Sequence, residues 1–149
     1  FRKFKFLVDF AHNPAGLELL CNFMSKLEGE PKVGIISGTG DRRDEDIKEL
    51  GRISSKCFDE IIIRQDKNLR GRSAEEIVNL LVDGINDAKT KEIPVTIIYK
   101  EKDAIMHAYN NAKPGSLITI MCDVVAEALD LIKNLKEKED AEVRLKVES

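Results

Sequence analysis

Near its amino terminus the chain reads Phe6-Leu7-Val8-Asp9-Phe10-Ala11-His12-Asn13-Pro14. An apolar run ends on an acid, and a histidine, an asparagine and a proline follow closely. Asn13 suits the residue that caps a helix, and Pro14 suits the first helical position. The stretch therefore predicts a strand, a short polar loop and the start of a helix. Because ligands of open α/β sheets bind at the carboxyl ends of strands, Asp9, His12 and Asn13 are the first candidate site residues.

The same order, a strand and then a helix, recurs along the chain. Apolar runs predict strands over residues 3–9, 33–37, 59–64, 95–99 and 117–122, and apolar residues at helical spacing follow each of them. This alternation predicts a Rossmann-like three-layer αβα domain with a mostly parallel sheet of about five to six strands. We assign residues 1–137 to this domain and residues 138–149 to a charged tail. Apolar residues alternate in the tail, so the tail is expected either to add a strand at the edge of the sheet or to be frayed.

Composition excludes several classes of protein. The chain has 149 residues, of which 42% are hydrophobic and 34% charged, as is usual for one soluble globular domain. A net charge of -3 argues against nucleic-acid binding, and no apolar run is long enough to span a membrane. Cys21, Cys57 and Cys122 are widely spaced and lack zinc-site spacing, which favours buried, reduced thiols in a cytoplasmic protein. A start at Phe1, without methionine, suggests a piece of a longer protein.

A second candidate loop, Gly38-Thr39-Gly40-Asp41-Arg42-Arg43-Asp44, follows the second predicted strand. Its glycines let the backbone approach a ligand, and the helix behind it offers N–H groups to an anion. Arg42 and Arg43 add guanidinium groups that suit phosphate. The loop is neither a dinucleotide fingerprint nor a P-loop, because the third glycine and the Gly-Lys-Ser/Thr sequence are missing. The alternative is a tight turn before a helix that begins with acidic residues. The loop alone does not decide between this turn and a phosphate-binding site.

A third charged loop follows the third predicted strand and contains Asp66, Arg70 and Arg72. Taken by itself, this loop is better explained by ordinary solvated charges than by a ligand site. Three charged loops at one edge of a parallel sheet nevertheless suggest a shared ligand edge. A single histidine in the first loop, without a second one nearby, does not predict a metal site. His107 lies in the middle of a predicted helix and is expected to be structural.

Taken together, these motifs resemble the Mur ligase family. Residues 8–14 resemble the Asp-(Tyr/Phe/Gly)-Ala-His-Asn-Pro motif that opens the C-terminal domain of that family, and residues 38–44 are similar to its glycine-aspartate-arginine loop. Within the family, residues 40–47 and 69–72 resemble the C-terminal module of the cyanophycin synthetases. The resemblance extends to about Leu135.

The resemblance implies an ATP-dependent amide ligase, in which an amine attacks an acyl phosphate. The C-terminal domain then closes over ATP and helps to position the incoming amino acid or peptide substrate. ATP and Mg²⁺ are bound mainly by a central domain of the same ligase, which this chain lacks. No catalytic or metal-binding residue is assigned to the chain itself. The implied nucleotide- and phosphate-binding residues are Asp9, His12, Asn13, Gly40, Asp41, Arg42 and Arg43, and the implied acceptor-binding residues are Arg70 and Arg72.

The chain departs from the family in two ways. Phe10 stands where tyrosine is common, and the P-loop is absent from the sequence, so we expect no ligation by the isolated chain. A free-standing Rossmann-like module that binds a nucleotide or an anion without catalysis is the alternative function. A third hypothesis treats the loops as turns of a structural domain. The sequence leaves a homo-oligomer open.

Overall fold

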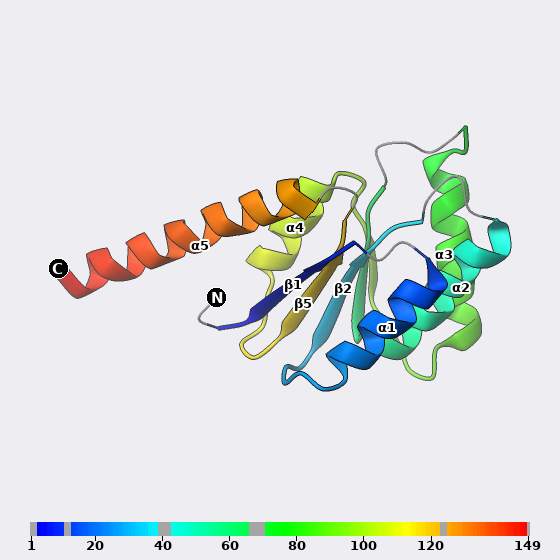
Figure 1. Ribbon diagram of the computed structural model, residues 1–149, viewed down its shortest axis with the longest axis horizontal. Coiled ribbons are helices and arrows are strands. Elements are labelled where there is room, and N and C mark those ends of the chain that lie inside the picture. The colour runs from blue at the N-terminus through cyan, green and yellow to red at the C-terminus, as the bar shows by residue number, and fades with distance from the viewer. Residues whose placement is uncertain (1–2, 11–12, 39–42, 66–70, 123–124, 149) are drawn as a thin grey trace.

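Five parallel strands form one sheet in the order β1-β5-β2-β3-β4 (Figure 1). The computed structural model describes residues 3–10, 13–38, 43–65, 71–122 and 125–148. Its strands are β1 (Lys5–Asp9), β2 (Lys32–Ile36), β3 (Glu60–Ile63), β4 (Val95–Ile97) and β5 (Leu117–Met121). Its helices are α1 (Pro14–Met24), α2 (Asp44–Cys57), α3 (Ala74–Ala88), α4 (Glu101–Asn110) and α5 (Val125–Glu148). This architecture confirms the predicted fold.

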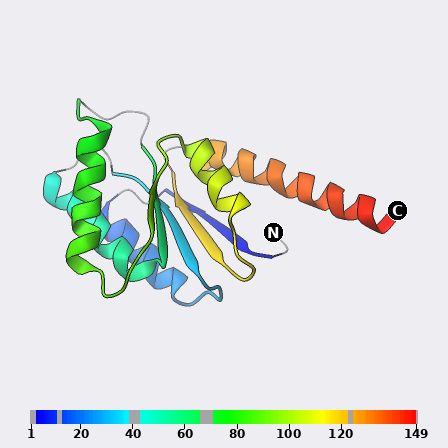
Figure 2. The same cartoon turned by 180° about the vertical axis from the view of Figure 1, so that it is seen from behind.

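Helices cover both faces of the sheet. α1, α2 and α3 lie on one face and α4 and α5 on the other (Figures 1 and 2). Side chains of each strand alternate between the two layers: Ile61 and Ile63 pack with the first three helices, and Ile62 packs with the other two. Strands buried on both faces need apolar residues at consecutive positions, which explains the run Ile61-Ile62-Ile63 of β3 and the largely apolar β5, whose one polar residue is the buried Thr119.

Side chains cap the first turns of two helices. Asn13 Oδ1 accepts a hydrogen bond of 2.7 Å from the N–H of Gly16 at the start of α1. The hydroxyl of Ser73 accepts a bond of 3.1 Å from the N–H of Glu76 at the start of α3. These two side chains satisfy N–H groups that the first turn of a helix leaves without backbone partners.

Helices α2 and α3 touch through their backbones. A Cβ added at Gly51 would lie 2.3 Å from the carbonyl oxygen of Leu81, and one added at Gly84 would lie 2.0 Å from that of Lys48. Each glycine thus admits the backbone of the neighbouring helix at a distance that any side chain would prevent. The contact fixes how the middle of α2 packs against the carboxyl-terminal half of α3.

The tail prediction needs a correction. Residues 138–148 continue helix α5, so the edge strand left open for them is wrong. Three alternating apolar residues are too few to outweigh a segment rich in lysine and glutamate, which are good helix formers. Figure 1 shows the distal part of α5 extending beyond the sheet. Among the described residues the sheet has five strands. No helix in this part of the chain has the length and apolar character needed to cross a membrane.

The cysteine prediction was also wrong for two of the three residues. Cys21 and Cys57 form a disulfide with their Cα atoms 5.7 Å apart, whereas Cys122 is free and buried. Both bonded cysteines are half-buried rather than buried. Helices α1 and α2 pack side by side on the same face, which brings together residues 36 positions apart. Sequence spacing carries no signal for such a tertiary pairing.

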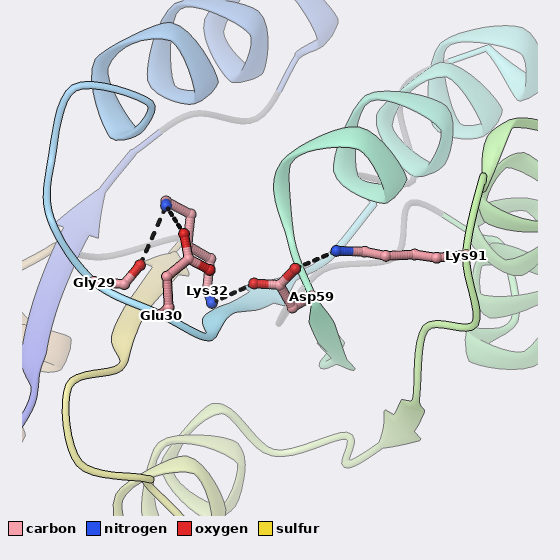
Figure 3. A network of polar contacts seen from close by, with 5 residues as sticks. All are labelled: Gly29, Glu30, Lys32, Asp59 and Lys91. Atoms are coloured by element: carbon pink, nitrogen blue, oxygen red, sulfur yellow. Dashed lines mark hydrogen bonds and ion pairs between the residues drawn. The ribbon is translucent and has the colours of Figure 1, made fainter.

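At the amino ends of β2 and β3 a polar network joins three segments (Figure 3). Asp59 Oδ2 accepts a bond of 2.8 Å from the N–H of Lys32, and its other carboxylate oxygen accepts one from Lys91 Nζ. Lys32 Nζ donates to Glu30 Oε1 at 2.9 Å and to the carbonyl oxygen of Gly29 at 3.2 Å. Partial burial alone would raise the pKa of Asp59, but the bonds from Lys32 and Lys91 outweigh it and hold this pKa below its ordinary value.

Reduction of the disulfide is expected to lower the free energy of unfolding by roughly 3–4 kcal/mol, because the unfolded chain regains the entropy of a 36-residue loop. Urea unfolding with and without a thiol reductant measures the change. A Cys21→Ser/Cys57→Ser variant is the control and should unfold identically in both conditions. Equal stability of the oxidised and reduced wild type would contradict the prediction.

Asp59 predicts a dependence of stability on acid. A carboxyl whose pKa is lowered by folding stabilises the protein above its unfolded pKa of about 3.9, and this contribution disappears as pH falls through the folded value. The variant Asp59→Asn should therefore be less stable than the wild type at neutral pH, and the difference should shrink below about pH 4. Thermal unfolding from neutral to acidic pH measures this convergence. Asp83→Asn, on the exposed side of α3, corrects for general loss of a carboxylate.

Candidate functional site

The carboxyl ends of the strands form one edge of the sheet. Asp9 is paired in register with Met121, and Ile36 with Ile63. The N–H of Cys122 donates to the carbonyl oxygen of Asp9 at 3.0 Å, which joins the ends of β1 and β5. Because all pairings are parallel, the residues that follow β1, β2, β3 and β5 meet at this edge. The structure therefore places the starts of these loops at one edge of the sheet, and ligand binding at this edge stays a prediction.

Asp9 and Asn13 lie at the outer end of this edge. Asp9 is the last residue of β1, and Asn13 caps α1. Both residues line a groove of about 540 Å³ that continues along β1 beside Leu7, Leu19 and Phe23. The capping bond uses the side-chain oxygen of Asn13, so the amide nitrogen is the group of Asn13 that is left for a ligand. The predicted cap at Asn13 is thus confirmed, and it does not exclude a binding role for this residue.

Arg43 stands at the start of α2 and is 83% exposed. Its guanidinium donates two bonds of 3.2 Å to the carboxylate of Asp46. This hydrogen bond, with the charge of the carboxylate, raises the pKa of Arg43. Exposed pairs of this kind are weak, so an anionic ligand can replace Asp46 at little cost.

Arg72 connects the second loop with the third. Its Nη1 donates to Asp44 Oδ1 at 2.6 Å and to Glu76 Oε1 at 3.0 Å. Asp44 begins α2, and Glu76 lies in the first turn of α3. The bond to Asp44 is the largest cause of the raised pKa of Arg72. The structure therefore brings Arg72 and the end of the glycine loop together, as the shared-edge hypothesis requires.

Packing explains why a glycine stands at position 38, the first glycine of the second loop. A Cβ added at Gly38 would lie 2.9 Å from Ile77 Cγ2 and 3.1 Å from Ile47 Cγ2. Gly38 thus lets the end of β2 pass between α2 and α3. This position supports the turn alternative and gives no evidence for a ligand.

Arg64 is a buried residue of the carboxyl edge that the sequence analysis did not single out. It follows β3 and its side chain is only 2% exposed. Its Nε donates to the carbonyl oxygen of Met121 at 2.9 Å and lies 3.6 Å from a carboxylate oxygen of Glu101. Arg64 thereby links β3, β5 and the start of α4 across the end of β2. The signal for it was a charged residue closing an otherwise apolar strand.

Several predicted site residues lie outside the part of the chain that the structure describes. They are His12, Gly40, Asp41, Arg42 and Arg70. Their roles stay predictions. Within the described ranges, no group of three or more histidine, cysteine, aspartate or glutamate side chains forms a candidate metal site. The described edge offers guanidinium groups and helix amino ends, which are donors for phosphate or carboxylate.

The fold and this edge define the chain as a Rossmann-like domain with an anion-compatible carboxyl edge. The family described as "Mur ligase, glutamate ligase domain" matches residues 2–124. The chain belongs to this family, which confirms the resemblance noted in its motifs.

Relatives of known identity support this assignment. The chain is 38% identical over 126 residues to a cyanophycin synthetase of Crocosphaera subtropica, covering 85% of this chain and 14% of the relative. It is 27% identical to a UDP-N-acetylmuramoyl-L-alanyl-D-glutamate–2,6-diaminopimelate ligase of Caldanaerobacter subterraneus, covering 80% of this chain and 24% of that ligase. The chain therefore spans only a small part of the length of these enzymes.

Solved structures show the same fold. One of a UDP-N-acetylmuramoyl-L-alanyl-D-glutamate–2,6-diaminopimelate ligase superposes with a TM-score of 0.69 at 20% identity, covering 79% of this chain and 23% of that one. The structure of E. coli FolC in complex with DHPP and ADP superposes with a TM-score of 0.64 at 20% identity. The match covers 87% of this chain and 29% of the FolC chain.

Replacing Arg64 with methionine is expected to lower the free energy of unfolding by about 1–3 kcal/mol, because Met121 loses a buried donor. Arg52→Met is the matched control, since Arg52 on α2 pairs with Glu49 at the surface and its loss should change stability much less. Urea unfolding of both variants measures the effect. Equal losses would show that the buried contacts of Arg64 do not support the edge.

Proposed function

We propose that this chain is the C-terminal domain of an ATP-dependent amide ligase similar to cyanophycin synthetase. In this role it closes over ATP and helps to position the incoming amino acid for attack on an acyl phosphate. The observation that carries the proposal is the 38% identity to a cyanophycin synthetase across 85% of the chain. The position of Asp9, Arg43 and Arg72 at the carboxyl edge, where the described ends of the three loops lie, supports it.

The nucleotide-facing part of the site comprises the first two loops. We assign it to Asp9, His12, Asn13, Gly40, Asp41, Arg42 and Arg43. Two facts support this assignment: α1 and α2 both begin at the carboxyl edge, and Arg43 holds Asp46 only through an exposed, replaceable pair. Helix amino ends and guanidinium groups both favour the oxygens of a phosphate.

The acceptor-facing part comprises Arg70 and Arg72. The position of Arg72 between the first turns of α2 and α3 supports this role, since its side chain is 21% exposed and already bonds two carboxylates. A guanidinium group that holds carboxylates suits the carboxylate of an incoming amino acid. Asp44 and Glu76 would orient Arg72 for this contact.

The remaining work belongs to the central domain of the same ligase. ATP would supply the phosphoryl group that activates the substrate carboxylate, and Mg²⁺ would be held mainly by that domain. The chain therefore contributes binding and orientation, and we assign it no catalytic residue. The isolated chain should be inactive and should bind Mg-ATP weakly or not at all, since half of the site is missing. We place the complete ligase in the cytoplasm.

A domain exchange tests the proposal. Residues 1–137 replace the matching domain of the Crocosphaera subtropica cyanophycin synthetase, and ADP release and amide formation are measured. The exchanged enzyme should be active. In it, Arg72→Ala should raise the KM for the acceptor amino acid about tenfold or more, because a charge-assisted bond is lost, while the KM for ATP stays similar. Arg42→Ala should instead impair the use of ATP.

Arg52→Ala is the matched control for both arginines, because Arg52 bonds carboxylates on α2 outside the proposed site and its loss should leave both KM values unchanged. An inactive exchanged enzyme that is folded, together with tight Mg-ATP binding by the isolated chain, would favour the non-catalytic binding module. Equal effects of Arg72→Ala and Arg52→Ala would overturn the acceptor assignment.

A further inference from the structure

The bond between Cys21 and Cys57 lies in a groove that is open to solvent. Both cysteines are half-buried, and they line a groove of about 660 Å³ between α1, α2 and the start of β2. Cys122, in contrast, is only 3% exposed, and its Sγ donates to the carbonyl oxygen of Asp9 at 3.4 Å. The groove therefore gives a thiol in solution a path to the bonded pair, and Cys122 has no such access.

The walls of this groove carry more negative than positive charge. Its charged lining residues are Glu18, Glu30, Glu49, Asp59, Lys32 and Lys56. Lysines of the network in Figure 3 already neutralise Glu30 and Asp59 in part. Because carboxylates outnumber ammonium groups, an uncharged thiol enters this groove more readily than an anionic one.

A disulfide is unusual in the compartment that the proposed function implies. Thiols are kept reduced in the cytoplasm, where disulfides are mostly transient and serve catalysis or redox sensing; disulfide-rich proteins of hyperthermophiles are the exception. This step rests on the proposed function, since that function places the ligase in the cytoplasm. A solvent-accessible pair there would exchange with cellular dithiols.

Reduction would change the attachment of one helix and leave the domain folded. Leu17, Leu20 and Met24 of α1 are buried in one apolar cluster with residues of α2 and α3. That packing remains without the bond, but side chains can adjust their rotamers. The backbone contact of α2 with α3 at Gly51 and Gly84 does not involve the bond at all. Opening the bond thus loosens α1 and leaves α2 fixed to α3.

We propose that Cys21 and Cys57 form a reversible redox site, which a dithiol opens through the groove and which sets how firmly α1 is attached to α2. Asn13 caps the start of α1 and Arg43 the start of α2, both at the carboxyl edge. The redox state of the pair therefore controls the spacing of two nucleotide-facing helix starts.

The reaction is a two-electron thiol–disulfide exchange. A thiolate of the dithiol attacks one sulfur of the bond and forms a mixed disulfide, and the other cysteine leaves as a thiolate that takes up a proton. The second thiol of the reductant loses its proton and attacks the reductant's own sulfur in the mixed disulfide, which releases the remaining cysteine. The dithiol is oxidised to a disulfide, and Cys21 and Cys57 are reduced to two thiols.

The rate of reduction in the folded 149-residue chain tests access to the bond. Dithiothreitol, an uncharged dithiol, is added with and without urea, and samples are alkylated and weighed by mass spectrometry. Reduction of the folded chain should be no more than about tenfold slower than in urea, whereas a bond that opens only on unfolding would react about a thousandfold slower or more. Cys122 should stay unlabelled by the alkylating agent until the chain unfolds.

A charge change tests the route through the groove. Glu18→Lys should raise the rate of attack by mercaptoethanesulfonate, an anionic thiol, about threefold relative to the rate with uncharged mercaptoethanol. Asp83→Lys is the matched control, because Asp83 is exposed on α3, outside the groove, and should leave this ratio unchanged.

Hydrogen exchange tests the loosening of α1. Reduction should speed the exchange of α1 amides about tenfold or more beyond any change in α3, because a local opening affects only the helix that it frees. A general loss of stability would instead speed both helices equally. The variant Cys21→Ser/Cys57→Ser should resemble the reduced chain in the presence and in the absence of reductant.

The exchanged cyanophycin synthetase tests the link to the nucleotide edge. Reduction should raise its KM for ATP about threefold, because the bond no longer preorganises the two helix starts. The KM for the acceptor amino acid should stay unchanged, since residues of α2 and α3 hold Arg72. The same enzyme with Cys21→Ser and Cys57→Ser should not respond to reductant, which controls for cysteines elsewhere in the ligase.

Three outcomes would overturn the redox proposal. One is reduction of the folded chain only at the rate of unfolding, which would make the bond purely structural. Another is equal acceleration of exchange in α1 and α3. The third is an active exchanged enzyme whose KM for ATP is the same in both redox states. An inactive exchanged enzyme would count against the proposed function alone, because the measurements on the chain decide the redox proposal independently.

Discussion

The buried side chain of Arg64 holds the carboxyl edge of the sheet together. Removing a guanidinium group from water is costly unless its donors find acceptors, and here they bond the carbonyl oxygens of Met121 and Gln65 beside the carboxylate of Glu101. Since β2 lies between β3 and β5, these contacts fix two strands that are not neighbours. The bond from Cys122 to the carbonyl oxygen of Asp9 extends the connection to β1. One connected set of contacts therefore positions the carboxyl ends of β1 and β3 relative to each other.

The described arginines in the loops of the carboxyl edge already pair with nearby carboxylates of the same chain. Arg43 bonds Asp46, and Arg72 bonds Asp44 and Glu76. A ligand with phosphate or carboxylate groups has to compete with these carboxylates. Competition is easy for the exposed pair of Arg43 and harder for Arg72, which two carboxylates hold at 21% exposure. The edge therefore combines one loosely held and one firmly oriented guanidinium group.

Local sequence signals predicted most of the fold. Contacts between residues far apart in the sequence were not predicted. The cap at Asn13 and the apolar runs of β3 and β5 follow from short-range chemistry, and the structure confirms them. The disulfide between Cys21 and Cys57 depends on the packing of α1 against α2, which spacing does not encode. Arg64 gave only the weak signal of a charge closing an apolar strand. In the tail, helix-forming residues outweighed a three-residue alternation of Val143, Leu145 and Val147.

The glycine contact between α2 and α3 has a mechanical consequence. Packed side chains accommodate small rotations by changing rotamers, but backbone pressed against backbone at Gly51 and Gly84 has no rotamers to change. The two helices therefore move together as one rigid unit. Asp44 and Arg72 lie at the amino end of this unit, and the Cys21–Cys57 bond lies at the carboxyl end of α2. A displacement of a few tenths of an ångström imposed at the charged end would be passed along the pair to α1 as a whole, rather than absorbed within either helix.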